Sequence, residues 1–370
     1  MNRALVDRIA DAVLYEGYIL YPYRPSVKNR QRWTFGGLYP EAYCQAQASS
    51  DASSNQTECL VRGGAATHIE AVARFLHLTA RRVGEVEKGV EKGARNLFDG
   101  VNQKTLEKVP DTFFRFFRPV ETLRVGEQSF HAWQEAEERE VVLDEVTLGE
   151  LLVHPRRVPF TFAGGRRCEP VRDPAGQIVG ALLREQQTIE GSIEVETAKV
   201  AEGLFRLTCR VVNHTPLTEA TTASRDNALL YSLISAHTLL GVRGGEFVSL
   251  LDPPECWREV AAACRNVGVW PVLVGAQGQT DTMLASPIIL YDYPQVAAES
   301  PGDFFDGTEI DEMLTLRILT MTDEEKRAMA AVDEKTRDLL ARTETLACEQ
   351  LLGLHGTIRE ARPIEESAHG

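Results

Sequence analysis

The amino-acid sequence predicts an α+β protein in which an N-terminal, mainly β region of sandwich or barrel-like form precedes an α/β C-terminal region. Apolar and polar residues alternate over 188–200 and 203–215, and a short turn joins these two runs. Further along the chain, helix-like and strand-like apolar runs follow one another instead. A chain of 370 residues also exceeds the usual size of one core. We therefore expect domains at 1–218 and 219–355 and a disordered tail at 356–370.

Hydrophobic spacing predicts the elements of the first region. Residues 2–15 place apolar side chains on one face and are expected to form a short helix. Alternating patterns predict strands at 58–62, 71–83 and 141–152. The charged, glycine-containing stretch 84–111 is interpreted as a long surface loop or an exposed helix.

The second region is expected to begin with a helix that Ser224 caps and that runs through Leu240 to an end at Gly241. The elements expected after it are strands at 247–251, 269–274 and 287–291 and helices at 254–267, at 309–319 and from Thr322 onward.

Charge and composition exclude some functions. The net charge of −14 argues against a nucleic-acid binder, because affinity for phosphate comes mostly from basic surfaces. The N-terminal residues include Asp7, Asp11 and Glu16 and match neither a signal peptide nor a membrane span. Seven cysteines without a close pair favour reduced thiols over a disulfide framework. We therefore expect a cytoplasmic protein with no membrane partner.

The first candidate site is an acidic loop. Between residues 292 and 335, twelve acidic side chains stand against four basic ones, a net charge of −8. Several of them suit the positive end of a helix and need no other role. The remainder, with one histidine, could bind a divalent transition metal, since carboxylate and imidazole ligands suit such ions. The candidate ligands are Asp292, Asp303, Asp306, Glu309 and His237.

A related grouping consists of Asp226, His237, Asp252 and Glu255, which could serve as an acid–base or metal site. On the expected helix from Ser224, His237 lies about three turns beyond Asp226 and hence on the same side. The sequence Asp252-Pro-Pro-Glu255 is equally well a turn that leads into a capped helix. The residues alone leave both interpretations open.

The second candidate site is an aromatic-basic segment, which we define as residues 15–39. Tyrosine, tryptophan and arginine are enriched at the energetic centres of protein interfaces. The same aromatic and basic side chains could stack on nucleic-acid bases, although the net negative charge of the protein disfavours this. They could also fill the end of a β-sandwich. The candidate partner-binding residues are Tyr21, Tyr23, Arg24, Arg30, Arg32 and Trp33.

Three stretches together, 14–40, 224–255 and 286–314, resemble an uncharacterised bacterial family whose members occur among the accessory genes of NiFe-hydrogenase clusters. The similarity spans nearly the whole chain. It implies a cytoplasmic accessory protein for maturation, assembly or protection of a metalloenzyme, with a hydrogenase subunit or a maturation factor as partner. It carries over no catalytic residue.

Two functions from different classes follow. The first is a non-catalytic accessory or assembly protein that acts through protein docking, which the resemblance favours. The alternative is a metal-binding protein or metal-dependent enzyme that uses the acidic loop 292–309. A homo-oligomer of structural function is a third expectation.

Overall fold

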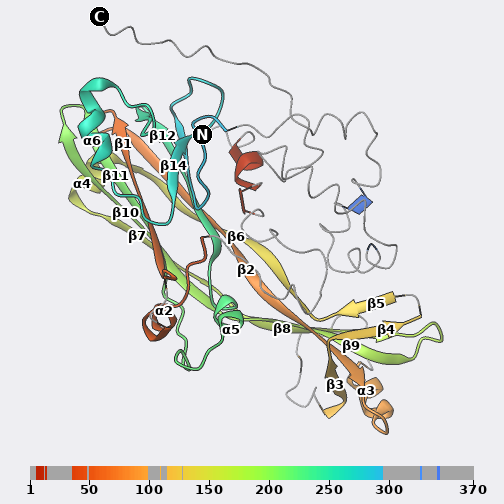
Figure 1. The fold of residues 1–370 in the computed structure, drawn as a ribbon. Helices are drawn as coiled ribbons and strands as arrows, with labels where there is room; N and C mark the ends of the chain where they lie inside the picture. Colours follow the sequence, from red (N-terminus) through yellow and green to blue (C-terminus); the bar gives the residue numbers. More distant parts are fainter. Residues whose placement is uncertain are drawn as a thin grey trace, which may run out of the picture.

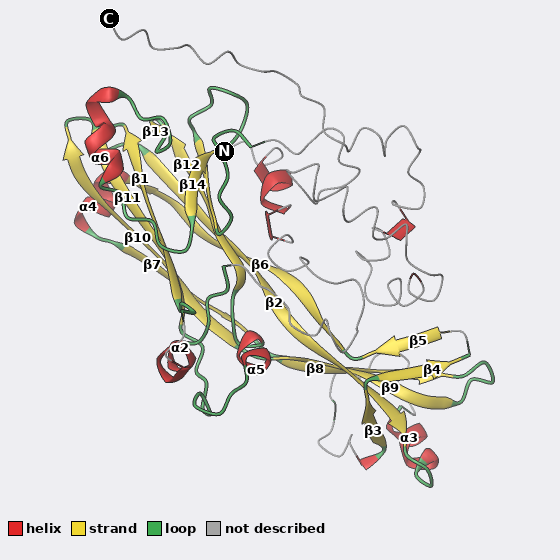
Figure 2. Cartoon of the chain, in the orientation of Figure 1, coloured by secondary structure: helices red, strands yellow, loops and turns green. Residues whose placement is uncertain are grey.

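The computed structural model describes residues 6–11, 13–14, 36–47, 50–98, 109, 115–126, 128–294, 326 and 340–341. Most of these residues lie in strands, and every strand pair is antiparallel (Figures 1 and 2). The strands are β1 (Ser54–Arg62), β2 (His68–Val86), β3 (Phe117–Val120), β4 (Thr122–Val125), β5 (Gln128–His131), β6 (Trp133–Thr147), β7 (Arg156–Phe162), β8 (Gly165–Arg172), β9 (Ile178–Gln186), β10 (Ile189–Ala201), β11 (Leu204–Asn213), β12 (Ile234–Arg243), β13 (Glu246–Val248), β14 (Trp270–Leu273) and β15 (Thr282–Ser286). The helices are short: α2 (Glu41–Gln47), α3 (Glu91–Leu97), α4 (Leu148–Val153), α5 (Arg225–Leu229), η3 (Glu255–Trp257) and α6 (Arg258–Ala262). Residues 6–11 and 13–14 are also helical.

Two sheets pack face to face as a β-sandwich. A five-stranded sheet has the order β13-β1-β11-β10-β7, and an eight-stranded sheet has the order β14-β15-β12-β2-β9-β8, with β3 and β6 also pairing with β2. Alternate residues of both sheets point between them and form one apolar core, which includes Ile69 and Phe75 of β2, Ile193 of β10, Leu207 of β11 and Leu240 of β12. The two-residue periodicity of these strands produces this core because successive side chains point to opposite faces.

The strand β2 joins the sandwich to a second structured part of the molecule. Its 19 residues pair with β12 near one end and with β9 and β3 near the other. Beyond the sandwich, β3, β4, β5, α3 and the far ends of β8 and β9 form an arm (Figure 1). Two small apolar clusters, around Phe117 and around Val83, stabilise this arm.

Between sandwich and arm, charged side chains line one face of the long strands. Arg81 of β2 and Arg184 of β9 both donate hydrogen bonds to the carboxylate of Glu135 on β6, at 2.9 and 2.6 Å. Arg184 also pairs with Glu169 of β8 at 3.0 Å. These partly buried charges are paired across strands, as their removal from water requires.

Different elements cover the outer faces of the two sheets. The N-terminal helical residues 6–11 and 13–14 pack Val6, Ile9 and Val13 onto the outer face of the eight-stranded sheet. The buried guanidinium of Arg74 ties this helix down by its pairing with Asp11 at 2.6 Å. On the five-stranded sheet, α6 places Ala261 against Leu60 and Leu204.

The mainly β, antiparallel character of the described residues fits the expected α+β class in broad terms. The hairpin of β10 and β11 and the strands β1, β2 and β14 confirm expected elements. The division into a β region and an α/β region is not confirmed, because β12 and β13 pair with β2 and β1. The sheets therefore extend across the expected boundary at 218/219.

Several expected elements of the second half are wrong. The helix from Ser224 to Leu240 is limited to α5, and residues 234–243 form the central strand β12 instead. The expected strand at 287–291 is an extended loop that follows β15. The expected helix at 254–267 is replaced by η3 and α6, which end at Ala262.

Two other expectations are modified, and some lie outside the described residues. The strand expected at 141–152 ends at Thr147, where a capping box begins α4. Within 84–111, residues 91–97 form the helix α3. The helices expected at 309–319 and from Thr322, and the tail at 356–370, fall outside the described residues.

Candidate functional site

A bulge in β12 contacts Val13, which precedes the aromatic-basic segment, and Gly36, which lies near the end of that segment. The register between β12 and β2 shifts between Ile234 and His237, and Ser235 has a positive φ of 52°. The Ser235 hydroxyl donates to the carbonyl of Val13 at 3.2 Å, and the Ala236 amide donates to the carbonyl of Gly36 at 3.0 Å. A non-glycine residue with positive φ is strained, and such strain often marks a functional constraint. Here the bulge directs two strand groups toward the flanks of one segment.

The chain that leads to the acidic loop touches the same bulge. Gly36 has φ +55°, and a Cβ atom built on it would lie 2.4 Å from Cβ of Pro287. Only glycine permits both this conformation and this close approach. The contact brings the flank of the aromatic-basic segment and the beginning of the chain toward Asp292 together, so both candidate segments depart from one junction.

From Ile288 to Tyr291 the chain alternates between packed and exposed apolar side chains. Ile288 and Leu290 pack into the apolar cluster under the N-terminal helix, and Tyr293 packs against the main core. Ile289 is 72% exposed and Tyr291 is 85% exposed. We call Ile289 and Tyr291 the outward strip. Large apolar side chains held outward on an ordered segment are typical of an interaction surface.

Asp292 fixes the end of the outward strip. Its carboxylate accepts a hydrogen bond from the amide of Leu273 at 2.7 Å and another from the hydroxyl of Ser249 at 2.5 Å. Ser249 Oγ in turn accepts hydrogen bonds from the amides of Leu251 and Asp252. Asp292 thereby joins three loops, and its role in the described residues is structural.

His237 is completely buried beside the bulge, in β12 rather than on the expected helix. Its Nδ1 donates to the carbonyl of Ser235 at 2.9 Å, which leaves Nε2 as the unprotonated nitrogen. Nε2 has no hydrogen-bond partner among the described residues. Burial lowers the pKa of His237 to about 4, so the ring is neutral at neutral pH.

The candidate metal ligands are only partly covered by the described residues. Both oxygens of Asp292 accept hydrogen bonds from the protein, and His237 is enclosed by its strand neighbours. Asp303, Asp306 and Glu309 lie outside the described residues. Within the described part of the chain, no group of three or more His, Cys, Asp or Glu side chains could hold a metal ion.

The related grouping around His237 is not brought together on one helix. Asp226 lies in the first turn of α5, which Ser224 caps through a hydrogen bond to the amide of Asn227. Asp252 and Glu255 belong to the turn before α6, and Glu255 pairs with Arg258 at 2.7 Å. Residues 252–255 therefore form a turn that leads into η3 and α6, as one of the two interpretations expected, but no side chain that the structure describes caps the start of either helix.

The six candidate partner-binding residues, Tyr21, Tyr23, Arg24, Arg30, Arg32 and Trp33, lie outside the described residues. What the structure adds is the position of the flanks of their segment on the β12 bulge. The sequence contained a signal for the outward strip that the expectation of a strand at 287–291 did not use. In Ile288-Ile289-Leu290-Tyr291 both alternate sets are apolar, so one set must face outward if the other is buried.

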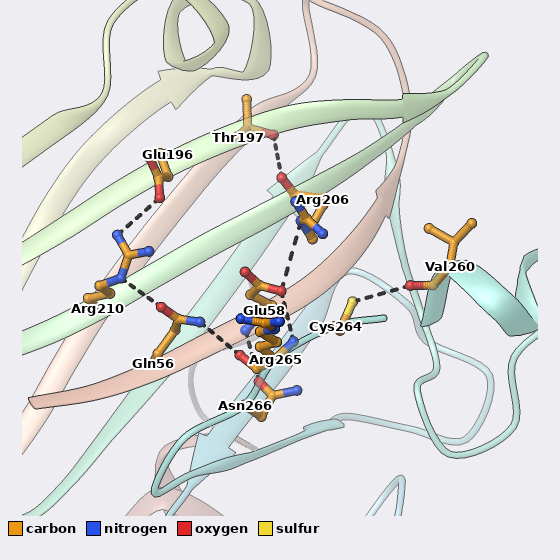
Figure 3. Close-up of polar contacts among 10 residues, drawn as sticks. All are labelled: Gln56, Glu58, Glu196, Thr197, Arg206, Arg210, Val260, Cys264, Arg265 and Asn266. Carbon is orange, nitrogen blue, oxygen red and sulfur yellow. Dashed lines mark hydrogen bonds and ion pairs between the residues drawn. The ribbon is translucent and has the colours of Figure 1, made fainter. Parts of the chain in front are cut away.

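Polar contacts on the outer face of the five-stranded sheet form a cluster that sequence patterns did not indicate (Figure 3). Glu58 of β1 is 8% exposed, accepts the amide of Arg265 at 2.8 Å and lies 3.9 Å from Arg206. Its own amide donates to the side chain of Asn266 at 2.8 Å. Burial and the Glu58 carboxylate raise the pKa of the Cys264 thiol to about 11, so this cysteine is not a thiolate nucleophile. The cluster docks residues 264–267 onto the sheet.

A serine–histidine pair on the same face is also explained by structure. Ser192 Oγ lies 2.8 Å from Nε2 of His214, but Arg157 donates to the same nitrogen at 2.9 Å. Arg157 therefore occupies the nitrogen through which a general base would take the proton of the serine. The serine is also completely buried.

No protein-family model, curated protein or solved structure matches this chain. Among the described residues, no helix is long and apolar enough to cross a membrane.

Proposed function

We propose that this chain is a cytoplasmic accessory protein in the maturation or assembly of a metalloenzyme, a NiFe-hydrogenase, and that it acts by docking to a hydrogenase subunit or a maturation factor. The metalloenzyme and the compartment follow from the sequence resemblance. The docking mode has its own support in the geometry, and one observation carries it. The outward strip exposes Ile289 and Tyr291, whereas their neighbours Ile288 and Leu290 pack against an apolar cluster and Asp292 is hydrogen-bonded.

A binding segment with a fixed backbone lowers the entropic cost of association. An interface formed by a mobile segment must first be ordered, which reduces the affinity. Leu290 is buried, Ile288 is partly buried against the same cluster, and Asp292 is bonded to Leu273 and Ser249, so the backbone of the strip is already fixed. A partner that covers Ile289 and Tyr291 would gain apolar burial at little ordering cost.

The test is affinity purification of the full-length chain from the organism that encodes it, at low salt. We expect a hydrogenase subunit or a maturation factor to co-purify with the wild type and to be lost with Ile289→Ser/Tyr291→Ser. Val153→Ser is the matched control, because Val153 is 68% exposed on α4. Recovery of the wild-type chain alone would refute the proposal.

The alternative function, metal binding by the acidic loop 292–309, receives less support from the described ligands. Asp292 already accepts two hydrogen bonds, and His237 is completely buried. Elemental analysis of tag-free protein purified without chelator decides between the two functions. Stoichiometric metal that Asp306→Ala removes would favour the alternative.

A further inference from the structure

We propose that the outward strip binds a protein segment that combines apolar with cationic side chains. This inference rests on the proposed docking function and adds the chemistry of the partner. Its basis is the juxtaposition of two exposed apolar side chains with the exposed Asp252, which forms no ion pair with any residue that the structure describes.

The apolar surface of the strip results from the alternation of packed and exposed side chains that begins at Ile288. Each buried residue of this segment contacts an apolar cluster, whereas Ile289 and Tyr291 are held on the opposite side. Leu251, also exposed, belongs to a loop joined to this segment, because its amide bonds to Ser249 Oγ, which bonds to Asp292. A partner must therefore bring apolar side chains to gain from this surface.

The electrostatic part comes from Asp252 and Asp292. The Ser249 hydroxyl donates to the Asp292 carboxylate and accepts the backbone amide of Asp252, so the two residues lie near each other at the end of the strip. Neither carboxylate forms an ion pair with any residue in the described ranges, whereas the neighbouring Glu255 pairs with Arg258. Asp292 is already held by two hydrogen bonds, whereas Asp252 is exposed, and an exposed carboxylate without a counter-charge attracts a cation and repels nucleic acid and anionic lipid.

Tyr291 can add to the same preference. An aromatic face attracts a lysine or arginine cation that lies over it. With 85% of the residue exposed, this face is accessible to a partner. The combined chemistry selects a basic, partly apolar protein segment rather than a purely apolar one.

The experiment uses the full-length chain and two synthetic ten-residue peptides, one alternating leucine with lysine and one alternating leucine with glutamate. Binding is measured by fluorescence anisotropy at low and at physiological salt. We expect the lysine peptide to bind and the glutamate peptide not to bind. Loss of two exposed anchors in Ile289→Ser/Tyr291→Ser should weaken binding at least about tenfold.

Two further variants separate the contributions. Asp252→Asn should weaken binding of the lysine peptide several-fold. It should also reduce the dependence of that binding on salt, because salt screens the attraction between charges. Val153→Ser, the exposed apolar control on α4, should leave binding unchanged. Unchanged thermal unfolding of every variant would show that each is folded.

Several results would overturn the inference. They are equal binding of the lysine peptide to the wild type and the double variant, equal binding of the glutamate peptide, or strip-dependent self-association without peptide, which would make a second copy the occupant. Failure of this inference can be told from failure of the proposed function. If a hydrogenase partner still co-purifies with the double variant, docking persists and only the assignment to the strip is wrong.

Discussion

Two segments lie on the outsides of the sandwich and use their side chains in opposite ways. Residues 264–267, on the five-stranded sheet, direct their polar groups to the sheet. The amide of Arg265 bonds to Glu58 (Figure 3). Val267 exchanges backbone hydrogen bonds with Gln56. Residues 286–293, on the eight-stranded sheet, are fixed by Leu290 and Asp292 but hold Ile289 and Tyr291 in solvent.

The two segments show which side chains stabilise the fold and which are accessible to a partner. A buried carboxylate that satisfies a backbone amide stabilises the fold, because the unsatisfied amide would be costly. An exposed isoleucine or tyrosine on a fixed backbone contributes little to folding. Predictions that change stability should therefore concentrate on Glu58 and Asp292, and those that change binding on the outward strip.

The largest effect is expected for Glu58→Ala. The substitution leaves the Arg265 amide without its acceptor and Arg206 without its nearest carboxylate. We expect the free energy of unfolding to fall by about 2–4 kcal/mol. Urea denaturation measures this change. Glu255→Ala, at a carboxylate whose side chain is 81% exposed, is the control and should be neutral. Equal stability of the two variants would break the distinction between the segments.

The second-largest effect on stability is expected from acid, because two buried histidines become protonated on unfolding. Burial lowers the pKa of His237 and of His77 to about 4, below the ordinary value of 6.5. The unfolded chain therefore binds more protons than the folded chain between pH 6.5 and 4, and stability must fall as the pH falls through this window. Each histidine accounts for up to about 3 kcal/mol.

Acid should affect the two outer segments differently. His237 lies next to the β12 bulge, which contacts Gly36, and Gly36 in turn approaches Pro287 in residues 286–293. Hydrogen exchange at pH 5 should show earlier opening around Ala236 than around Gln56, whose amide bonds to Val267. His237→Gln should flatten the dependence of stability on pH between 6.5 and 4. An unchanged slope in this variant would contradict the assignment to His237.

Asp292→Ala should have an intermediate effect. It removes the acceptor of the Leu273 amide and of the Ser249 hydroxyl. We expect a loss of about 1–2 kcal/mol, since both groups can find water at this partly buried position. The same variant should also weaken partner binding, because the strip loses its fixed end. Thermal unfolding measures the first consequence and binding of the lysine peptide measures the second. Asp252→Asn is the control for stability only, because the backbone amide that bonds to Ser249 is retained.

The smallest effect on stability is expected for the strip itself. Ile289→Ser/Tyr291→Ser should change the free energy of unfolding by no more than about 0.5 kcal/mol, because both side chains are exposed. Chemical denaturation next to the wild type is the measurement. A larger loss would show that these residues serve the fold, and would weaken the docking proposal.

Local pattern predicted part of this fold well. The β10–β11 hairpin was predictable because its strands alternate in burial and are joined by a tight turn at Gly203. The β12 strand was not, because nine of its ten residues are buried, so alternation is absent. A fully buried strand and a buried helix share the same apolar pattern, and helix-forming leucines favoured the wrong choice.

The candidate site was predictable in its location more than in its chemistry. The sequence drew attention to Asp292 as the start of an acidic loop, but its bonds to Ser249 and Leu273 join loops from three parts of the chain. Pairing of residues so distant in sequence depends on tertiary structure, which no local pattern encodes. For the same reason, the contact of Gly36 with Pro287 could not be foreseen.

One consequence of the long strand β2 concerns how this protein can change over generations. At about 3.3 Å per residue, its 19 residues span roughly 60 Å and belong to the cores of both sandwich and arm. Inserting one residue midway would exchange inside and outside for every later position. Insertions and deletions can therefore be tolerated in the turns, whereas the number of residues in β2 must be conserved.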